Sequence, residues 1–209
     1  MSAVTLRQSE QQEVNSDRRI RWTRDQCEMM VDAEILVGRY ELIDGEIINI
    51  MGQNAPHIWG VRNITSWLAG IFGINFISVQ LSLDVEHSDK INNDPIPDVY
   101  VSAKAFQAYP TEVTPVQDVV LLIEVADSSR RDDLGKKADL YARSGIADYW
   151  VLDITNRSIH VHRQPTPLGY LSVLVYAECE SISPLSRPDA SISAIDLLPP
   201  VSLKQGELK

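Results

Sequence analysis

The sequence predicts an α/β or α+β fold, in which a mixed central β-sheet is flanked by helices and has a β-hairpin near its N-terminus. Two observations support this class. Apolar residues recur at spacings of three and four in some stretches, as in amphipathic helices, and at every second position or without interruption in others, as in strands. Helix-like and strand-like stretches follow one another along the chain, which favours helices packed on the faces of one sheet.

The first half of the chain contains a predicted hairpin, two helices and a strand. Residues 1–21 are polar and aperiodic, so we expect a disordered lead-in. A short helix should follow over 23–35, with a threonine as its N-cap. An Asp-Gly pair between two apolar runs predicts a β-hairpin over 40–50. The pattern then changes to an Asn-capped helix over 54–73 and a strand over 76–85 with one polar face.

The second half is richer in strands. Residues 119–126 (VVLLIEVA) are apolar on both faces apart from one glutamate, which is typical of a central strand covered on both sides. Residues 127–145 open with capping residues and end on a glycine, as a helix does. Shorter strands are expected over 97–101, 148–154, 158–163 and 170–177, with a hairpin turn at 155–157.

Length and charge limit the class of protein. The 209 residues favour one domain, which we place at 22–198, followed by a C-terminal tail at 199–209. Lys and Arg number 19 against 29 Asp and Glu, which gives a net charge of −10. Non-specific affinity for DNA comes from neutralising phosphates, so this charge excludes general coating of nucleic acid but allows a local basic groove.

The cysteines and the apolar runs indicate the compartment. Cys27 and Cys179 are far apart and belong to no Cys/His pattern, which excludes a zinc ribbon and a disulfide scaffold and fits a reducing compartment. No stretch approaches the roughly 18 apolar residues of a membrane span, and the first residues lack the apolar segment of a signal peptide. We therefore expect a cytoplasmic protein with no membrane partner.

Two carboxylates mark the expected site. Glu124 lies within the apolar strand, where an ionised side chain is costly unless it is paired or bound to a cation. One interpretation is a glutamate at a strand end paired with an arginine. Asp98, directly after Pro97 at the start of another strand, favours a second one, in which two carboxylates on adjacent strands share a divalent ion. Oxygen ligands of this kind suit magnesium (Mg²⁺), with manganese (Mn²⁺) as an alternative.

Lys137 is the third candidate. At about 100° per residue it lies about 60° from Leu134, on the border of an apolar helical stripe, whereas Lys136 lies about 160° away and points to water. The ammonium group of Lys137 could therefore reach the sheet edge near Glu124. The alternative is a lysine whose aliphatic stem packs on the stripe while its charge stays in water.

These residues resemble the PD-(D/E)XK nuclease signature. Asp98 after Pro97 supplies the first part and Glu124 the second, while Ala126 occupies the position of the final lysine. A longer series of blocks, in order over roughly residues 25–198, is similar to the Uma-type family of restriction endonuclease-like bacterial proteins. The blocks are YELIDGEI, the Pro56-His57 pair, PDVYV, IEVADSS, DLGKKADLYARSGI and YWVLD.

The resemblance implies a restriction-endonuclease-like fold, magnesium-dependent cleavage of DNA phosphodiester bonds and a homodimer. It also implies that a helix lysine, here Lys137, replaces the lysine missing from the strand. Asp98 and Glu124 would then hold the metal, and Lys137 would stabilise charge on the phosphate. The alternatives are a metal-dependent hydrolase of another substrate, or a catalytically inactive nuclease fold retained as a binding or assembly module. The net charge favours the inactive module, and it predicts that any DNA binding is weak and salt-sensitive.

Five further residues are candidates, each with a plainer alternative. Glu46 matches the family's acidic hairpin residue and is either a metal or water ligand or an exposed strand residue. His57 is either a general base or phosphate contact or a core histidine. Gln80 matches a family position and is expected to line the cleft. Arg130 and Arg131 either contact the phosphate backbone or belong to a solvated helix face.

Overall fold

The computed structural model describes residues 19–50, 53–86, 88–109 and 113–201. The expected lead-in at 1–21 and tail at 199–209 lie almost entirely outside these residues. Within the described ranges, no helix is both long and apolar enough to cross a lipid bilayer.

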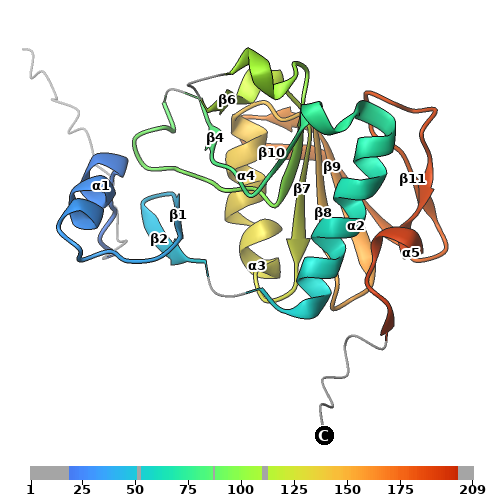
Figure 1. The fold of residues 1–209 in the computed structure, drawn as a ribbon, viewed down its shortest axis with the longest axis horizontal. Coiled ribbons are helices and arrows are strands. Elements are labelled where there is room, and N and C mark those ends of the chain that lie inside the picture. The colour runs from blue at the N-terminus through green and yellow to red at the C-terminus, as the bar shows by residue number, and fades with distance from the viewer. Residues whose placement is uncertain (1–18, 51–52, 87, 110–112, 202–209) are drawn as a thin grey trace, which may run out of the picture.

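A six-stranded mixed sheet forms the centre of the domain and confirms the predicted fold class (Figure 1). The strand order is β10-β9-β8-β7-β5-β3, in which β7 and β8 are the parallel neighbours. β7 has the bounds that its sequence predicts, and all of its residues except Val120 are buried, because helices cover both faces. The strands are β3 (Ile77–Val79), β5 (Val99–Ser102), β7 (Val119–Ala126), β8 (Asp148–Asp153), β9 (Ser158–Thr166) and β10 (Gly169–Ala177).

Helix α2 (Ala55–Phe72) covers one face of the sheet. It begins after Asn54, whose side chain accepts a hydrogen bond from a backbone N–H of the first turn, and it ends at Gly73, as the sequence predicts. Gly60 lets α2 approach the sheet closely, since a Cβ there would lie 2.9 Å from Cγ1 of Val125 in β7. The apolar stripe of α2 joins the core cluster on this face through Val61, Ile64 and Leu68.

The opposite face is covered by α3 (Arg130–Asp133) and α4 (Lys136–Arg143), where the sequence predicts one continuous helix. The helix is interrupted at Gly135, whose φ of −115° and ψ of −103° lie outside the helical region. A Cβ at this position would lie 2.8 Å from the carbonyl oxygen of Arg131, so glycine is needed at the break. Beyond the break, α4 packs on the sheet through Ala138, Leu140 and Tyr141.

The expected strand over 76–85 is wrong as a single element. The chain forms a 3₁₀ turn (Ile74–Phe76), then β3, and after a turn a separate short strand, β4 (Leu83–Asp84). Gln80 lies in the turn with a φ of +53°, which an extended strand does not accommodate. The alternation is therefore lost, and Leu81, expected on the apolar face, is 56% exposed.

The predicted hairpin is present as β1 (Tyr40–Ile43) and β2 (Glu46–Asn49). Asp44 and Gly45 both have positive φ, as a two-residue turn of this kind requires. The preceding helix α1 (Arg24–Asp32) has the expected threonine cap but ends three residues earlier than the sequence pattern suggests. In Figure 1, α1 and the hairpin extend from one side of the sheet domain.

The C-terminal segment completes the core on the face that α2 covers. Ala194 and Leu197 are fully buried there. β8 and β9 form the predicted hairpin, and β10 pairs antiparallel with β9. The remaining short elements are β6 (Thr114–Pro115), β11 (Ser181–Ile182), β12 (Ile192–Ser193), α5 (Ala194–Leu197) and 3₁₀ turns at Phe106–Ala108 and Val116–Asp118.

Candidate active site

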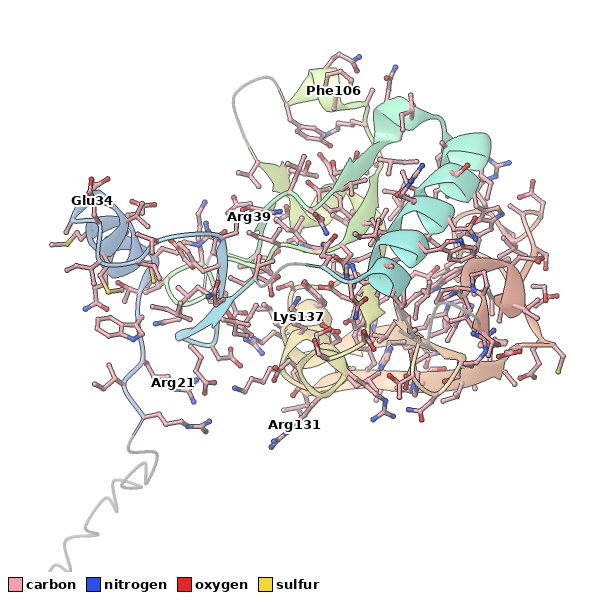
Figure 2. The ribbon with its side chains drawn as sticks, turned by 60° about the horizontal axis from the view of Figure 1, so that its bottom comes forward. Arg21, Glu34, Arg39, Phe106, Arg131 and Lys137 are labelled. Atoms are coloured by element: carbon pink, nitrogen blue, oxygen red, sulfur yellow. The ribbon has the colours of Figure 1, made fainter. Side chains whose placement is uncertain are left out.

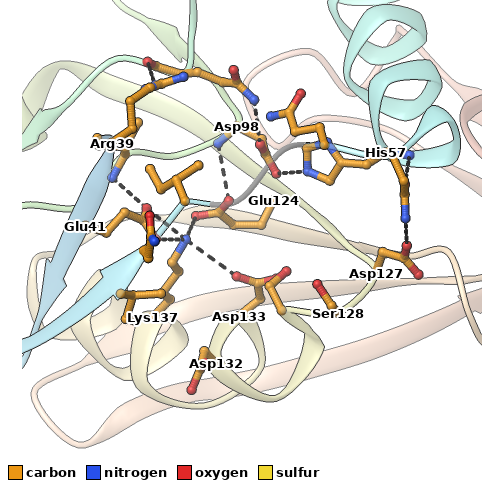
Figure 3. Close-up of a pocket in the computed structure, with 18 residues that line it drawn as sticks. Arg39, Glu41, His57, Asp98, Glu124, Asp127, Ser128, Asp132, Asp133 and Lys137 are labelled. Carbon is orange, nitrogen blue, oxygen red and sulfur yellow. Dashed lines mark hydrogen bonds and ion pairs between the residues drawn. The ribbon is translucent and has the colours of Figure 1, made fainter. Parts of the chain in front are cut away.

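A pocket of about 320 Å³ opens where the N-terminal hairpin, the start of α2 and the α3–α4 segment meet the ends of β5 and β7 (Figure 3). Arg39 and Lys137 are the positively charged side chains in its lining. Carboxylates are far more numerous, so the pocket is strongly acidic. They are Glu41, Asp98, Glu124, Asp127, Asp132 and Asp133.

The sheet register brings Asp98 and Glu124 together. Val99 of β5 pairs with Ile123 of β7, so the residue before Val99 and the residue after Ile123 lie opposite each other on the same face. The backbone N–H of Asp98 donates a hydrogen bond to Oε2 of Glu124 at 3.2 Å. The two carboxylates therefore lie side by side at one end of the pocket, Glu124 in β7 and Asp98 directly before β5, as the sequence analysis expects.

The carboxylate of Asp98 is held from three sides. Oδ2 accepts a hydrogen bond from the backbone N–H of Val125 at 2.9 Å and lies 3.1 Å from Nε2 of His57. Oδ1 accepts one from Nε2 of Gln80 at 3.3 Å. Burial by itself would raise the pKa of Asp98, but the interactions with His57 and Val125 lower it below its usual value. Asp98 is therefore ionised at neutral pH.

Glu124 and Lys137 form a buried ion pair, with side chains that are 3% and 6% exposed. Nζ of Lys137 lies 3.0 Å from Oε1 of Glu124, which also accepts a hydrogen bond from the hydroxyl of Tyr141 at 3.0 Å. Burial raises the pKa of Glu124 well above its usual value, with Lys137 opposing the shift and nearby carboxylates adding to it. Burial would lower the pKa of Lys137, but the same carboxylates raise it, so the ammonium group stays charged.

Two more carboxylates surround Lys137, and the sequence analysis identifies neither. Oε2 of Glu41, on β1, lies 2.9 Å from Nζ, and Oδ1 of Asp133, at the end of α3, lies 3.6 Å from it. Oε1 of Glu41 also accepts a hydrogen bond from the backbone N–H of Ile96 at 2.8 Å. Both have a sequence signal: Asp133 precedes Lys137 by four residues, and Glu41 interrupts an apolar strand as Glu124 does.

One oxygen of Asp133 has no hydrogen-bond partner among the described residues. This buried oxygen, Oδ1, has only the ion-pair contact with Lys137 at 3.6 Å, whereas Oδ2 accepts a hydrogen bond from the hydroxyl of Ser129. Burial raises the pKa of Asp133 to about 6, with Lys137 and the Ser129 hydroxyl opposing the shift. The pocket thus holds more buried negative charge than Lys137 neutralises, and a cation bound nearby would relieve that excess.

The carboxylates of Asp98 and Glu124 are the candidate oxygen ligands for a metal ion in this pocket. Within the described ranges, no group of three or more His, Cys, Asp or Glu side chains is arranged to hold a metal ion. Mg²⁺ is commonly bound through one or two carboxylates while it keeps several water ligands. The adjacent carboxylates of Asp98 and Glu124 meet that requirement.

His57 belongs to the pocket rather than to the apolar core. It lies in the first turn of α2, where its backbone N–H donates to Oδ1 of Asn54 at 3.0 Å. Burial would lower the pKa of His57, but the contact with Asp98 raises it above its usual value. Nδ1 is buried without a hydrogen-bond partner among the described residues. Asn54 also donates to Asp127 at the rim, which ties the start of α2 to the end of β7.

Gln80 lines the pocket, as expected, although it lies in a turn rather than on the polar face of a strand. Its side chain reaches Asp98 because β3 pairs with β5: Val79 lies opposite Val99, and the backbone N–H of Gln80 donates to the carbonyl oxygen of Asp98 at 3.1 Å. Nη2 of Arg39 donates to the carbonyl oxygen of Gln80 at 3.0 Å, so the hairpin side of the pocket is joined to this turn.

Glu46 lies outside the pocket lining, in a position closer to the alternative of a strand residue at the surface than to that of a metal ligand. It binds Lys136, and it lies 2.9 Å from Nη1 of Arg19. The hairpin register explains this position, because Glu46 pairs with Ile43 beside the turn, two positions from the pair that contains Glu41. Lys136 is therefore an ion-pair partner rather than a lysine exposed only to water.

The two arginines before α4 also lie outside the pocket lining. Arg130 binds the buried carboxylate of Asp153 at the end of β8. Arg131 extends from the outer side of α3 into solvent, whereas Lys137 lies inside (Figure 2). The structure therefore gives Arg130 a structural partner and leaves Arg131 on a solvated face.

Comparisons with known proteins identify the family to which this chain belongs. Residues 35–194 match the family described as "Uma2: Putative restriction endonuclease". This chain belongs to the Uma2 family. A solved structure with the same fold as this Uma2 chain is that of "a putative nuclease belonging to DUF820 from Anabaena variabilis ATCC 29413". The two are 16% identical with a TM-score of 0.63, and the match covers 84% of this chain and 96% of the other. No match to a curated protein was found.

Proposed function

We propose that this Uma2 protein is an endonuclease that hydrolyses DNA phosphodiester bonds with the help of bound Mg²⁺. The observation that best supports the proposal is the meeting of Asp98, Glu124 and Lys137, from two strands and a helix, in one open pocket. The descriptions of the matching family and of the structural neighbour also support a nuclease.

Asp98 and Glu124 would hold the metal ion, and Mn²⁺ would fit the same oxygens. A bound divalent ion would polarise the scissile phosphate and make an attacking water more acidic. Asp98 suits this task because His57 and the Val125 N–H keep it ionised and oriented. For Glu124, the hydroxyl of Tyr141 and the ammonium of Lys137 fix one oxygen.

Lys137 would stabilise the negative charge that develops on the phosphate. Its Nζ already lies at 3.0 Å from Glu124, so a phosphate held by a metal ion at this carboxylate would lie beside the ammonium group. Glu41 holds the ammonium group in a fixed place at 2.9 Å. A charge that is positioned before the reaction begins needs no rearrangement in the transition state, and such fixed charges are the most effective ones.

DNA must approach a protein with a net charge of −10. Phosphates are repelled by most of the surface and by the pocket carboxylates, so we expect binding to be weak and strongly salt-dependent. A divalent ion at Asp98 and Glu124 would reduce the repulsion at the pocket itself.

Cleavage of plasmid and linear DNA with Mg²⁺ or Mn²⁺ tests the proposal. Lys137→Ala should lower turnover by about 10²–10³, as the loss of one preorganised charge does. Lys136→Ala is the matched control, since Lys136 is the neighbouring lysine of the same helix and lies outside the pocket lining; turnover should be nearly unchanged. Equal losses in both variants would remove Lys137 from the mechanism.

Calorimetry with Mg²⁺ in the absence of DNA separates metal binding from catalysis. Glu124→Gln should weaken metal binding by about tenfold or more. Lys137→Ala should not weaken it at a pH where Glu124 is ionised, because a nearby cation competes with the metal. DNA binding without metal and without cleavage under any condition would instead favour the inactive binding module.

A further inference from the structure

The outermost strand of the sheet has an open edge. β10 pairs with β9 from Gly169 opposite Thr166 to Ala177 opposite Ser158, with a gap in the pairing at Leu171. In the part of the chain that the structure describes, no strand pairs with its other edge. Among the described residues, no loop or turn forms a backbone hydrogen bond with residues 170–176. The outward N–H and C=O groups of β10 are therefore available to another strand.

The side chains of this edge are apolar and uncharged. Leu171 is 74% exposed, Val173 48%, Leu174 53% and Val175 55%. Consecutive residues of a strand project from opposite faces, so apolar surface is exposed on both sides of β10. The strand, GYLSVLVYA, contains neither the charged residues nor the proline with which proteins usually protect an edge from pairing.

We propose that two copies of this chain associate through β10, with the two β10 strands antiparallel about a two-fold axis. Such an axis pairs each residue of β10 with a residue of the same strand in the other copy, so both sides offer an equally long, uncharged edge. Two proteins with a net charge of −10 repel each other over most of their surfaces. Pairing at β10 places no like charges opposite each other, so charge favours this edge for a second copy.

The contact is small and leaves the pockets open. It involves nine residues of each chain, about 30 Å of strand, compared with about 20–30 residues per side in a standard interface. Interfaces below the standard size are typical of weak or transient association. β8 and β9 separate β10 from β7, so each copy keeps its own pocket accessible. The proposal does not depend on nuclease activity.

Sedimentation velocity of the full chain, from about 1 to 100 µM, tests the association. The wild-type protein should shift from monomer to dimer as its concentration rises. Leu171→Lys and Val175→Lys each place a charge on the edge and should raise the dissociation constant by about tenfold or more. Ile74→Lys is the matched control, because Ile74 is an apolar residue, 62% exposed, beyond the opposite edge of the sheet; this variant should dimerise like the wild type.

Amide hydrogen exchange of the unmodified protein identifies the surface without any substitution. Backbone amides within 170–176 should exchange more slowly at about 100 µM, where the dimer forms, than at about 1 µM, where the monomer predominates. The backbone amides of β3 should exchange at the same rate at both concentrations. A protein that stays monomeric throughout would overturn the proposal. A dimer that both β10 substitutions leave intact, or that forms without protection of these amides, would overturn it as well.

Discussion

Replacing Lys137 with methionine should destabilise the protein strongly, because it removes the positive charge that Glu41, Glu124 and Asp133 share. Methionine retains most of the aliphatic stem, so packing changes little. All four side chains are at most 7% exposed, and Nζ lies within 3.6 Å of each carboxylate. Breaking a buried ion pair by removing one partner costs about 3–5 kcal/mol, since the remaining charge is buried without compensation. We expect a loss of that size at pH 7.

Lys136→Met shows what a partly exposed ion pair contributes. The side chain of Lys136 is 33% exposed and that of its partner Glu46 is 25% exposed. Such pairs contribute about 0–1 kcal/mol, so this neighbouring substitution should cost far less than Lys137→Met.

The deficit of Lys137→Met should depend on pH. The pKa of Asp133 is already raised to about 6, and burial raises the pKa of Glu124. Without the ammonium group these shifts increase. When the pKa of a carboxyl group is raised in the folded state, the free energy of unfolding of the protein falls as pH rises through that pKa. The variant should therefore recover stability as pH falls from 7 to 5, about where buried carboxyl groups take up protons.

Urea unfolding of both variants and the wild type, followed by circular dichroism at the two pH values, measures the free energy of unfolding directly. The reasoning fails if Lys137→Met is no less stable than Lys136→Met at neutral pH. It also fails if the deficit of Lys137→Met is the same at the lower pH.

Two other predictions concern packing and protonation away from the pocket charges. Gly60→Ala should lower the free energy of unfolding in the same urea titration by about 1–3 kcal/mol, because its Cβ would lie 2.9 Å from Val125. Gly70→Ala, in the same helix, is the control: its Cβ would meet nothing within 4 Å, so this substitution should be neutral or stabilising. Wild-type stability should fall as pH drops from 6.5 to about 4, since burial lowers the pKa of His162 to about 4. This shift corresponds to up to about 3 kcal/mol, and His162→Phe should remove that part of the pH dependence; equal slopes would contradict it.

The pattern within the element was enough to predict the structure of β7 and α2, whereas it was not enough for the stretch over 76–85 or for the helix that breaks at Gly135. The uninterrupted apolar run of β7 gives its bounds and its central place, and it makes Glu124 conspicuous. The burial of Lys137 agrees with the helical angles, although their reference, Leu134, lies at the break before α4 rather than within it. Leu134 and Lys137 are less than one helical turn apart, so the break at Gly135 changes the expected direction of the Lys137 side chain little.

The two glutamates of the hairpin show where such reasoning ends. Glu41 and Glu46 lie on the same face, and the two pairs Glu41–Ile48 and Ile43–Glu46 place them two positions apart. That spacing, about 7 Å along the strand, decides which lysine of α4 each one meets. The position of the hairpin against α4 depends on tertiary packing, which local sequence does not encode, so the hairpin sequence alone does not show that Glu41 rather than Glu46 contacts Lys137.

The ion pair between Glu41 and Lys137 links positions 96 residues apart. A ribosome adds residues at about 5–20 per second, so Glu41 is made roughly 5–20 s before the lysine that completes its surroundings. During that interval Glu41 lacks its buried cation, and the hairpin cannot take its final place beside α4. The pocket is therefore completed late in synthesis. A chain that is released before Lys137 has been added already contains all six pocket carboxylates and strands β5 and β7, but it lacks the buried ammonium group that Glu41, Glu124 and Asp133 share.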